Sequence, residues 1–136
     1  MATRPKTDPV FDRNPPQDID AERAVLGAML LDSDAIGTAV EILRENPAEV
    51  FYAQPHQHLY GAMLSLYRKN TAVDATTLVH QLNRDGALEE VGGAAYVAEL
   101  TGAVPTSANI EHYARIVLDA AVLRRTITVC TRVIGK

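Results

Sequence analysis

Apolar residues recur every three or four positions through five consecutive stretches of the chain, between about residue 18 and residue 101. This spacing places the apolar side chains of each stretch on one face of an α-helix. In chain order, the inward-facing positions are Ala21, Ala24, Val25, Ala28, Met29 and Leu31; Ile36, Val40 and Leu43; Leu59, Tyr60, Met63, Leu66 and Tyr67; Leu78, Val79 and Leu82; and Tyr96, Val97 and Leu100. The alternation of β-branched residues that indicates strands is almost absent. The pattern therefore predicts an all-α domain.

Capping and helix-breaking residues mark the boundaries between these stretches. Asp, Asn, Ser and Thr side chains accept hydrogen bonds from the first amides of a helix, whereas Pro and Gly interrupt one. The boundary residues are Asp18 or Asp20 before the first helix, Asp32 and Ser33 before the second, Asn46 and Pro47 after the second, Pro55 and Lys69 at the ends of the third, Asp74 and Asp85-Gly86 at the ends of the fourth, Gly92 and Gly93 before the fifth, and Pro105, Thr106 and Ser107 at the start of a sixth. We expect Phe51 and Tyr52, in the connector before the third helix, both to insert into the core.

The sixth and longest helix carries two apolar stripes rather than one. At about 100° per residue, one stripe contains Ile116, Ala120, Leu123, Ile127, Cys130 and Ile134, and a second, nearly opposite stripe contains Leu118, Val122, Val129 and Val133. A helix that packs on a single core needs only one apolar face. Two faces predict two partners, and the preceding helices can cover only one end. Both stripes run to the last residues without a polar stop, so we expect the chain to end inside an element whose missing partner lies downstream or on another chain.

Composition and charge narrow the functional classes. The 136 residues are enough for one domain, and with no Trp and only two Phe, aliphatic residues must fill most of the core. The net charge of −4 differs from the basic surface that proteins use to bind nucleic acid, so we expect little direct DNA binding. The single cysteine, Cys130, excludes an internal disulfide and suits a reducing compartment. Without a signal peptide or an apolar run that could span a bilayer, a cytoplasmic location with no membrane partner is expected.

The residues with catalytic or binding chemistry do not form a recognisable site. Gly135 and Lys136 lack the upstream glycine and the following hydroxyl of a phosphate-binding P-loop. His56 and His58 are two positions apart, which on a helix turns their imidazoles about 200° away from each other. They cannot share a metal ion there, so His56 is expected to be a packing or capping residue and His58 to be solvated. We expect no catalytic residue, no cofactor and no metal site in this chain.

Four segments, in this order, resemble the N-terminal domain of the bacterial replicative DNA helicases of the DnaB family. They are PPQDIDAERAVLGAMLLD (15–32), VFYAQPHQHLYGAMLSLY (50–67), VDATTLVHQLNRDGALEEVGGAAYVAEL (73–100) and VPTSANIEHYARIVLDAAVLRRTI (104–127). Residues 1–17 are rich in Pro and charge and lack periodicity, so we expect a flexible arm there. The resemblance implies a globular helical head over residues 18–104 and the first helix of a truncated helical hairpin over residues 105–136. It also implies a hexameric helicase that unwinds DNA at the replication fork, with ATP and Mg²⁺ used by a RecA-like ATPase domain absent from this chain.

The same resemblance implies roles for Tyr96 and for residues of the last helix, because hairpins of the family pair between copies and form a collar that recruits primase. The implied oligomer interface is Leu118, Val122, Val129 and Val133; the implied hairpin packing is Ile116, Leu123, Ile127, Cys130 and Ile134; and the implied primase-docking residues are Tyr96, Arg124 and Arg125. A helicase loader is a further implied partner. From the residues alone, the two arginines fit a docking surface or the solvated edges between two apolar stripes equally well.

Two other functional classes compete with this interpretation. A small all-α chain could be a helix-turn-helix DNA-binding protein, but the sequence lacks the basic recognition helix that such a protein needs. A small hydrolase would need a convergent set of polar side chains, and the sequence shows none. The non-catalytic helicase domain is therefore the favoured hypothesis.

Overall fold

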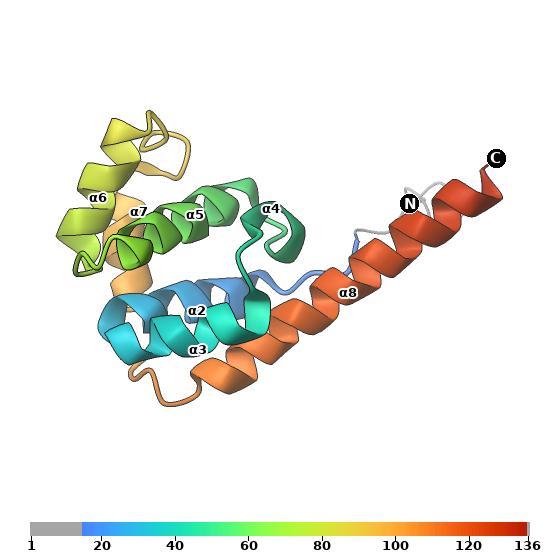
Figure 1. Cartoon of the computed structure of the whole chain (residues 1–136), viewed down its shortest axis with the longest axis horizontal. Helices are drawn as coiled ribbons and strands as arrows, with labels where there is room; N and C mark the ends of the chain where they lie inside the picture. The colour runs from blue at the N-terminus through green and yellow to red at the C-terminus, as the bar shows by residue number, and fades with distance from the viewer. Residues whose placement is uncertain (1–14, 136) are drawn as a thin grey trace, which may run out of the picture.

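The computed structural model describes residues 15–135, and over that range its regular elements are all helices. They are α2 (Ile19–Leu31), α3 (Ser33–Leu43), α4 (Pro47–Val50), α5 (Gln54–Arg68), α6 (Ala75–Arg84), α7 (Gly93–Thr101) and α8 (Ile110–Ile134). The helices α2 to α7 and the first turns of α8 form a rounded body, from which the rest of α8 projects (Figure 1). The all-α prediction is confirmed. The flexible arm predicted for residues 1–17 falls almost entirely outside the described residues.

The helix α2 lies at the centre of the body, in contact with α3, α5, α7 and α8. Its residues Leu26 and Met29 have no exposed surface. Gly27 allows α7 to approach closely, because a Cβ atom at this position would collide with the carbonyl oxygen of Leu100. The core is therefore built around a helix crossing that has no room for a side chain.

Aspartates begin three of the helices. Asp18 caps α2, Asp32 caps α3 and Asp74 caps α6, each with a side-chain oxygen that accepts from an amide of the first turn. The α6 cap is reciprocal, because the Thr77 hydroxyl also accepts from the Asp74 amide. Asp32 additionally accepts a hydrogen bond from the Ser107 hydroxyl at 3.0 Å, which ties the segment before α8 to the junction of α2 and α3. The predicted caps at these three aspartates are confirmed.

The last helix begins later than predicted. It starts at Ile110, whereas the Pro105–Ser107 segment was expected to start it. The Ser107 hydroxyl bonds to Asp32 and does not cap α8. The Ile110 amide donates to the Ser107 carbonyl at 3.1 Å and so closes a turn before the helix. The segment between α7 and α8 is thus a connector held by the body.

The side of α8 that packs on α2 and α3 lies between the two predicted stripes. The buried residues on that side are Ile110, Ala114, Val117 and Ala121. Ile116 and Leu118, one from each stripe, flank it and are partly buried against the same core. Residues 110–121, called the inner half of α8 below, therefore belong to the core, which continues past residue 104. Residues 122–134 are called the outer half.

Three side chains that were predicted to face the core are exposed: Leu31 at 46%, Tyr52 at 38% and Tyr67 at 41%. Leu31 and Tyr67 lie in the last turns of α2 and α5, where the apolar face runs past the edge of the core. Tyr52 follows the fully buried Phe51 in an extended connector, in which successive side chains point in opposite directions. The proline after α3 also starts the one-turn helix α4, since proline fits the first position of a helix.

Candidate functional site

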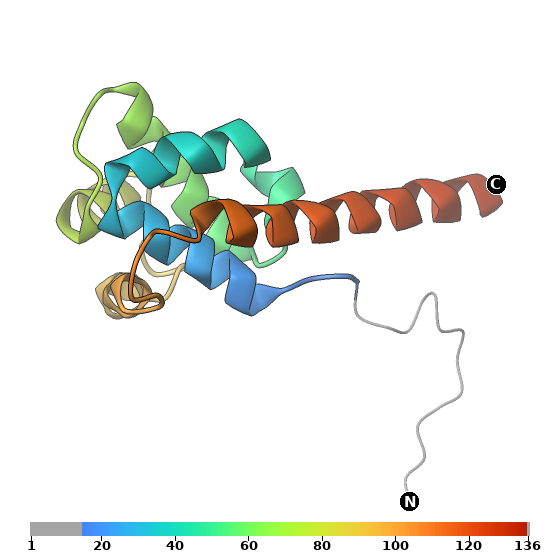
Figure 2. The ribbon, with the colours of Figure 1, turned by 90° about the horizontal axis from the view of Figure 1, so that it is seen from below.

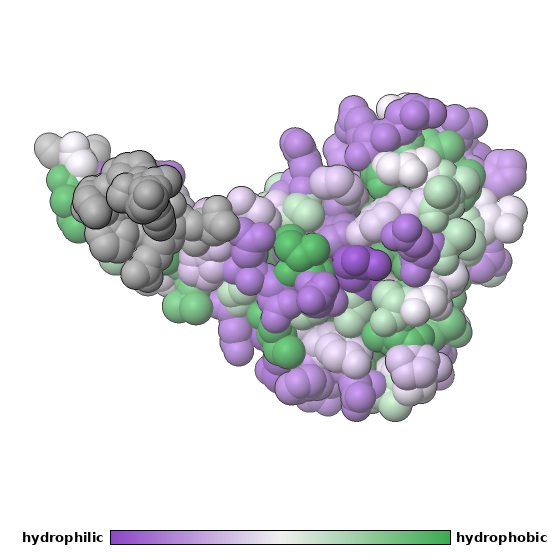
Figure 3. All heavy atoms as spheres, turned by 180° about the vertical axis from the view of Figure 1, so that it is seen from behind, coloured by the Kyte–Doolittle hydropathy of each residue, from purple (hydrophilic) through white to green (hydrophobic). Residues whose placement is uncertain are grey.

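The outer half of α8 projects from the body (Figure 2), and its apolar side chains are exposed. The exposed fractions are 54% for Val122, 54% for Leu123, 40% for Ile127, 48% for Val129, 68% for Val133 and 81% for Ile134. Cys130 is exposed as well. In the space-filling view, a few apolar residues show at the end and edge of the projecting helix (Figure 3). Because large exposed apolar patches mark interaction sites, the outer half of α8 is the candidate interaction surface.

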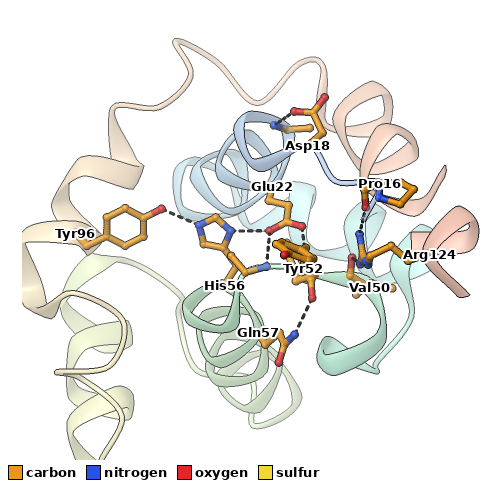
Figure 4. A network of polar contacts seen from close by, with 12 residues as sticks. Pro16, Asp18, Glu22, Val50, Tyr52, His56, Gln57, Tyr96 and Arg124 are labelled. Atoms are coloured by element: carbon orange, nitrogen blue, oxygen red, sulfur yellow. Dashed lines mark hydrogen bonds and ion pairs between the residues drawn. The ribbon is translucent and has the colours of Figure 1, made fainter. Parts of the chain in front are cut away.

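A buried carboxylate organises the region from which α8 projects (Figure 4). Glu22 on α2 is only 1% exposed. One of its oxygens accepts from the Tyr52 amide at 2.7 Å, and the other accepts from the Ala53 amide at 3.3 Å and lies 2.8 Å from Nδ1 of His56. Three donors offset the cost of removing a carboxylate from water. Glu22 therefore holds the connector between α4 and α5 against α2.

His56 extends this network to α7. Its ring is buried, with Nε2 placed 2.7 Å from the Tyr96 hydroxyl oxygen, and the His56 and Tyr96 rings are stacked at an angle of 14°. Burial raises the pKa of the Tyr96 hydroxyl; the nearby Arg23 guanidinium lowers it, and the Glu99 and Glu22 carboxylates raise it further. Tyr96, an expected docking residue, is half-buried and has its hydroxyl bonded within the body.

Arg124 lies one turn past Ala121, the last buried residue of α8. Its Nη1 donates to the Pro16 carbonyl at 2.9 Å and its Nη2 to the Val50 carbonyl at 3.2 Å. Its Cζ lies 5.5 Å from the centre of the Tyr52 ring, within cation–π range. Burial lowers the pKa of the Arg124 guanidinium, and the Glu22 carboxylate and Tyr52 raise it. Arg124, the second expected docking residue, thus has three partners inside the body.

Arg125, the third expected docking residue, has a different environment. Its side chain is 74% exposed and its nearest acidic partner is Glu49, at 3.6 Å. An exposed pair of this kind contributes little to stability. Arg125 is therefore free to contact a partner, whereas Tyr96 and Arg124 stand at opposite ends of one internal network (Figure 4).

The remaining candidate chemistry is dispersed. Within residues 15–135, no three His, Cys, Asp or Glu side chains come together in a way that could hold a metal ion. His58 forms an exposed pair with Glu90 at 3.0 Å, in keeping with its expected solvation. Among the helices described, none has the length and apolar character needed to cross a membrane.

Glu22 is a residue that the sequence analysis missed. Its signal is its position four and seven residues before Leu26 and Met29, both fully buried, which places it on the inward face of α2. A buried carboxylate requires donors. The sequence does not name them, because His56 lies 34 residues away and the other two donors are backbone amides.

Comparisons with known proteins agree with this architecture. The family of the DnaB-like helicase N terminal domain matches residues 14–119. The chain is 46% identical, over 91% of its length, to the replicative DNA helicase DnaB of Mycobacterium leprae. It is 44% identical, over 93% of its length, to the replicative DNA helicase DnaC of Bacillus subtilis. The chain spans 20% and 27%, respectively, of the lengths of these two relatives.

A solved structure shows the same fold. The crystal structure of the N-terminal domain of DnaB helicase from Mycobacterium tuberculosis matches with a TM-score of 0.85 at 46% identity, covering 90% of this chain and 83% of that one. The family match includes the whole body, with Glu22, His56 and Tyr96, and nearly all of the inner half of α8. The chain belongs to the family of DnaB-like helicase N-terminal domains.

Proposed function

We propose that this chain is the oligomerisation and primase-docking domain of a hexameric replicative helicase. The observation that carries the proposal is the outer half of α8, which projects from the body with six aliphatic side chains between 40% and 81% exposed. The relatives are named replicative DNA helicases. Copies of the domain associate through this helix, and the assembled surface recruits primase at the replication fork.

The two stripes of the outer half contact different partners in the assembly. Val122, Val129 and Val133 face a second copy, and the opposite stripe, including Leu123 and Ile127, packs in a helical hairpin. Burial of one aliphatic side chain contributes about 1.5–3 kcal/mol. Several such side chains together can therefore offset the cost of association. A two-fold pairing buries the same patch on both copies and closes on itself. Ile116 and Leu118 contribute less, because the body already covers part of each.

The motor activity belongs to another part of the longer protein. A RecA-like domain of that protein uses ATP and Mg²⁺, and a helicase loader is a further partner in the cytoplasm. The sequence of this chain contains no P-loop, so the chain should neither bind nor hydrolyse ATP. Calorimetric titration that reveals a micromolar nucleotide site would refute this part of the proposal.

Sedimentation over a range of concentrations tests the assembly role. The parent chain should self-associate, and Val122→Asp with Val129→Asp should be monomeric and equally helical by circular dichroism. Thr128→Asp with Thr131→Asp is the matched control, because it adds the same charge to the outer half away from the second stripe. A parent that stays monomeric at millimolar concentration contradicts the proposal, as does a double variant that associates as well as the parent.

Primase docking is tested with Arg125 and Tyr96. Arg125→Ala should weaken binding of the domain to primase without lowering the melting temperature, since its side chain is largely exposed. Tyr96→Ala should also weaken binding but removes the partner of the buried His56, so thermal melting must accompany the binding measurement. Primase binding unchanged in both variants would remove these residues from the docking surface.

A further inference from the structure

The outer half of α8 is attached to the body at one end only. Ala121 is the last residue of the helix that is buried in the body. Among residues 15–135, the polar contacts that join the outer half to the body are those of Arg124 and the exposed pair of Arg125 with Glu49. At 1.5 Å per residue the outer half extends about 20 Å, so a rotation of about 10° at its base moves its tip by about 3 Å. A small change in the angle at which α8 leaves the body therefore moves the exposed apolar side chains near its end by several ångströms.

Arg124 makes contacts that a swing of the helix would break. The carbonyls of Pro16 and Val50 belong to two segments far apart in sequence, one just before α2 and one at the end of α4. The donors of a guanidinium have fixed directions in one plane, so both carbonyls are reached at once only over a narrow range of helix directions. The Tyr52 ring supports the guanidinium at 5.5 Å. We propose that Arg124 is a positioning residue that fixes the direction in which the outer half of α8 leaves the body.

The support under Arg124 is itself anchored in the core. The Tyr52 amide is held by Glu22 at 2.7 Å, and the same carboxylate holds Ala53 and His56. The Glu22 charge also favours the cationic form of the partly buried Arg124 guanidinium. Arg124 thus rests on a segment that cannot move without breaking a buried network (Figure 4).

The direction of the outer half has a consequence for assembly. In a symmetric assembly the relative orientation of paired surfaces decides whether the copies close into a ring or continue as an open chain. This consequence rests on the proposed function. The positioning itself is a property of one copy, so the two can be tested separately.

Distances within one chain test the positioning. Spin labels are attached at Asn83→Cys, on the exposed side of α6, and Thr128→Cys, on the outer half, in a Cys130→Ser background. Labelled chain is diluted with unlabelled chain, so double electron–electron resonance measures intrachain distances alone. The parent should give one narrow distance distribution. Arg124→Met keeps the aliphatic stem but not the hydrogen-bond donors, so it should give a broad distance distribution. Arg125→Met, the matched control, should stay narrow.

Each result decides the proposal. A distribution in Arg124→Met as narrow as in the parent overturns it, and so does equal broadening in Arg125→Met. If circular dichroism shows that Arg124→Met is unfolded, Arg124→Lys decides, because an ammonium group keeps the charge but lacks the forked geometry that spans both carbonyls. A narrow distribution in Arg124→Lys then overturns the proposal, and a broad one in a helical chain supports it. A chain that is monomeric but has the expected distances would refute the assembly role and leave the positioning role intact.

Discussion

The two halves of α8 contain similar numbers of aliphatic residues but meet different surroundings. The inner half buries Ala114, Val117 and Ala121 against α2 and α3, and two of these three side chains are small. The outer half exposes branched residues such as Val122 and Val133. A single continuous helix thus passes from a core element to a projecting one within about one turn. Small residues allow close approach to the body, and larger aliphatic residues remain for a partner.

The largest expected effect contrasts one valine in each half. Val117→Asp should lower the free energy of unfolding by about 3 kcal/mol or more, because it places a charge without a partner in the core. Val129→Asp should change stability by less than about 0.5 kcal/mol at concentrations where the chain is monomeric. Urea denaturation of the two variants gives both values. Equal losses in the free energy of unfolding would mean that the outer half is covered in the monomer, and that the two halves of α8 do not differ in the way described.

The helix crossing inside the body gives the next largest effect. Gly27→Ala should lower the free energy of unfolding by about 1–3 kcal/mol, since the added methyl group collides with the Leu100 carbonyl. Gly61→Ala on α5 is the control, because its Cβ would lie at an ordinary 3.6 Å from Pro47. It should raise stability by about 0.5–1 kcal/mol through helix propensity. Similar effects at both glycines would argue against a tight crossing.

Tyr96→Phe separates the internal network from the outer half. Loss of the hydroxyl leaves Nε2 of His56 without its partner, so stability should fall by about 1 kcal/mol. Self-association should not change, because Tyr96 lies on α7, away from the outer half. Thermal melting and sedimentation of the same preparation measure both quantities. A change in association with unchanged melting would place Tyr96 at an interface between copies.

The smallest effect is expected at the exposed pair beside Arg124. Glu49→Gln should alter stability by less than about 0.5 kcal/mol, and added salt should reduce even this difference. Denaturation at low and high ionic strength checks it. A loss above about 1 kcal/mol would show that this pair stabilises the protein more than an exposed ion pair is expected to.

The sequence predicts the helices better than it predicts the faces they bury. Gly92 and Gly93 correctly mark the start of α7, and their φ angles of 102° and 74° lie in the region that glycine favours. Hydrophobic periodicity marks the stripes of α8 but not its packed side, because Ala114 and Ala121 differ little in hydrophobicity from surface alanines. The partners of Glu22 and Arg124 are mostly backbone groups, which leave no signal in side-chain patterning.

The packing of the inner half of α8 against α2 and α3 joins the first and last helices of the described chain. About 90 residues separate the end of α2 from Ala121, so these contacts close a long loop. On a ribosome that adds roughly 5–20 residues per second, that interval lasts on the order of 5–18 s. During this time the apolar faces of α2 and α3 that later meet α8 have no permanent cover. The nascent chain is therefore a candidate for chaperone protection until α8 has emerged.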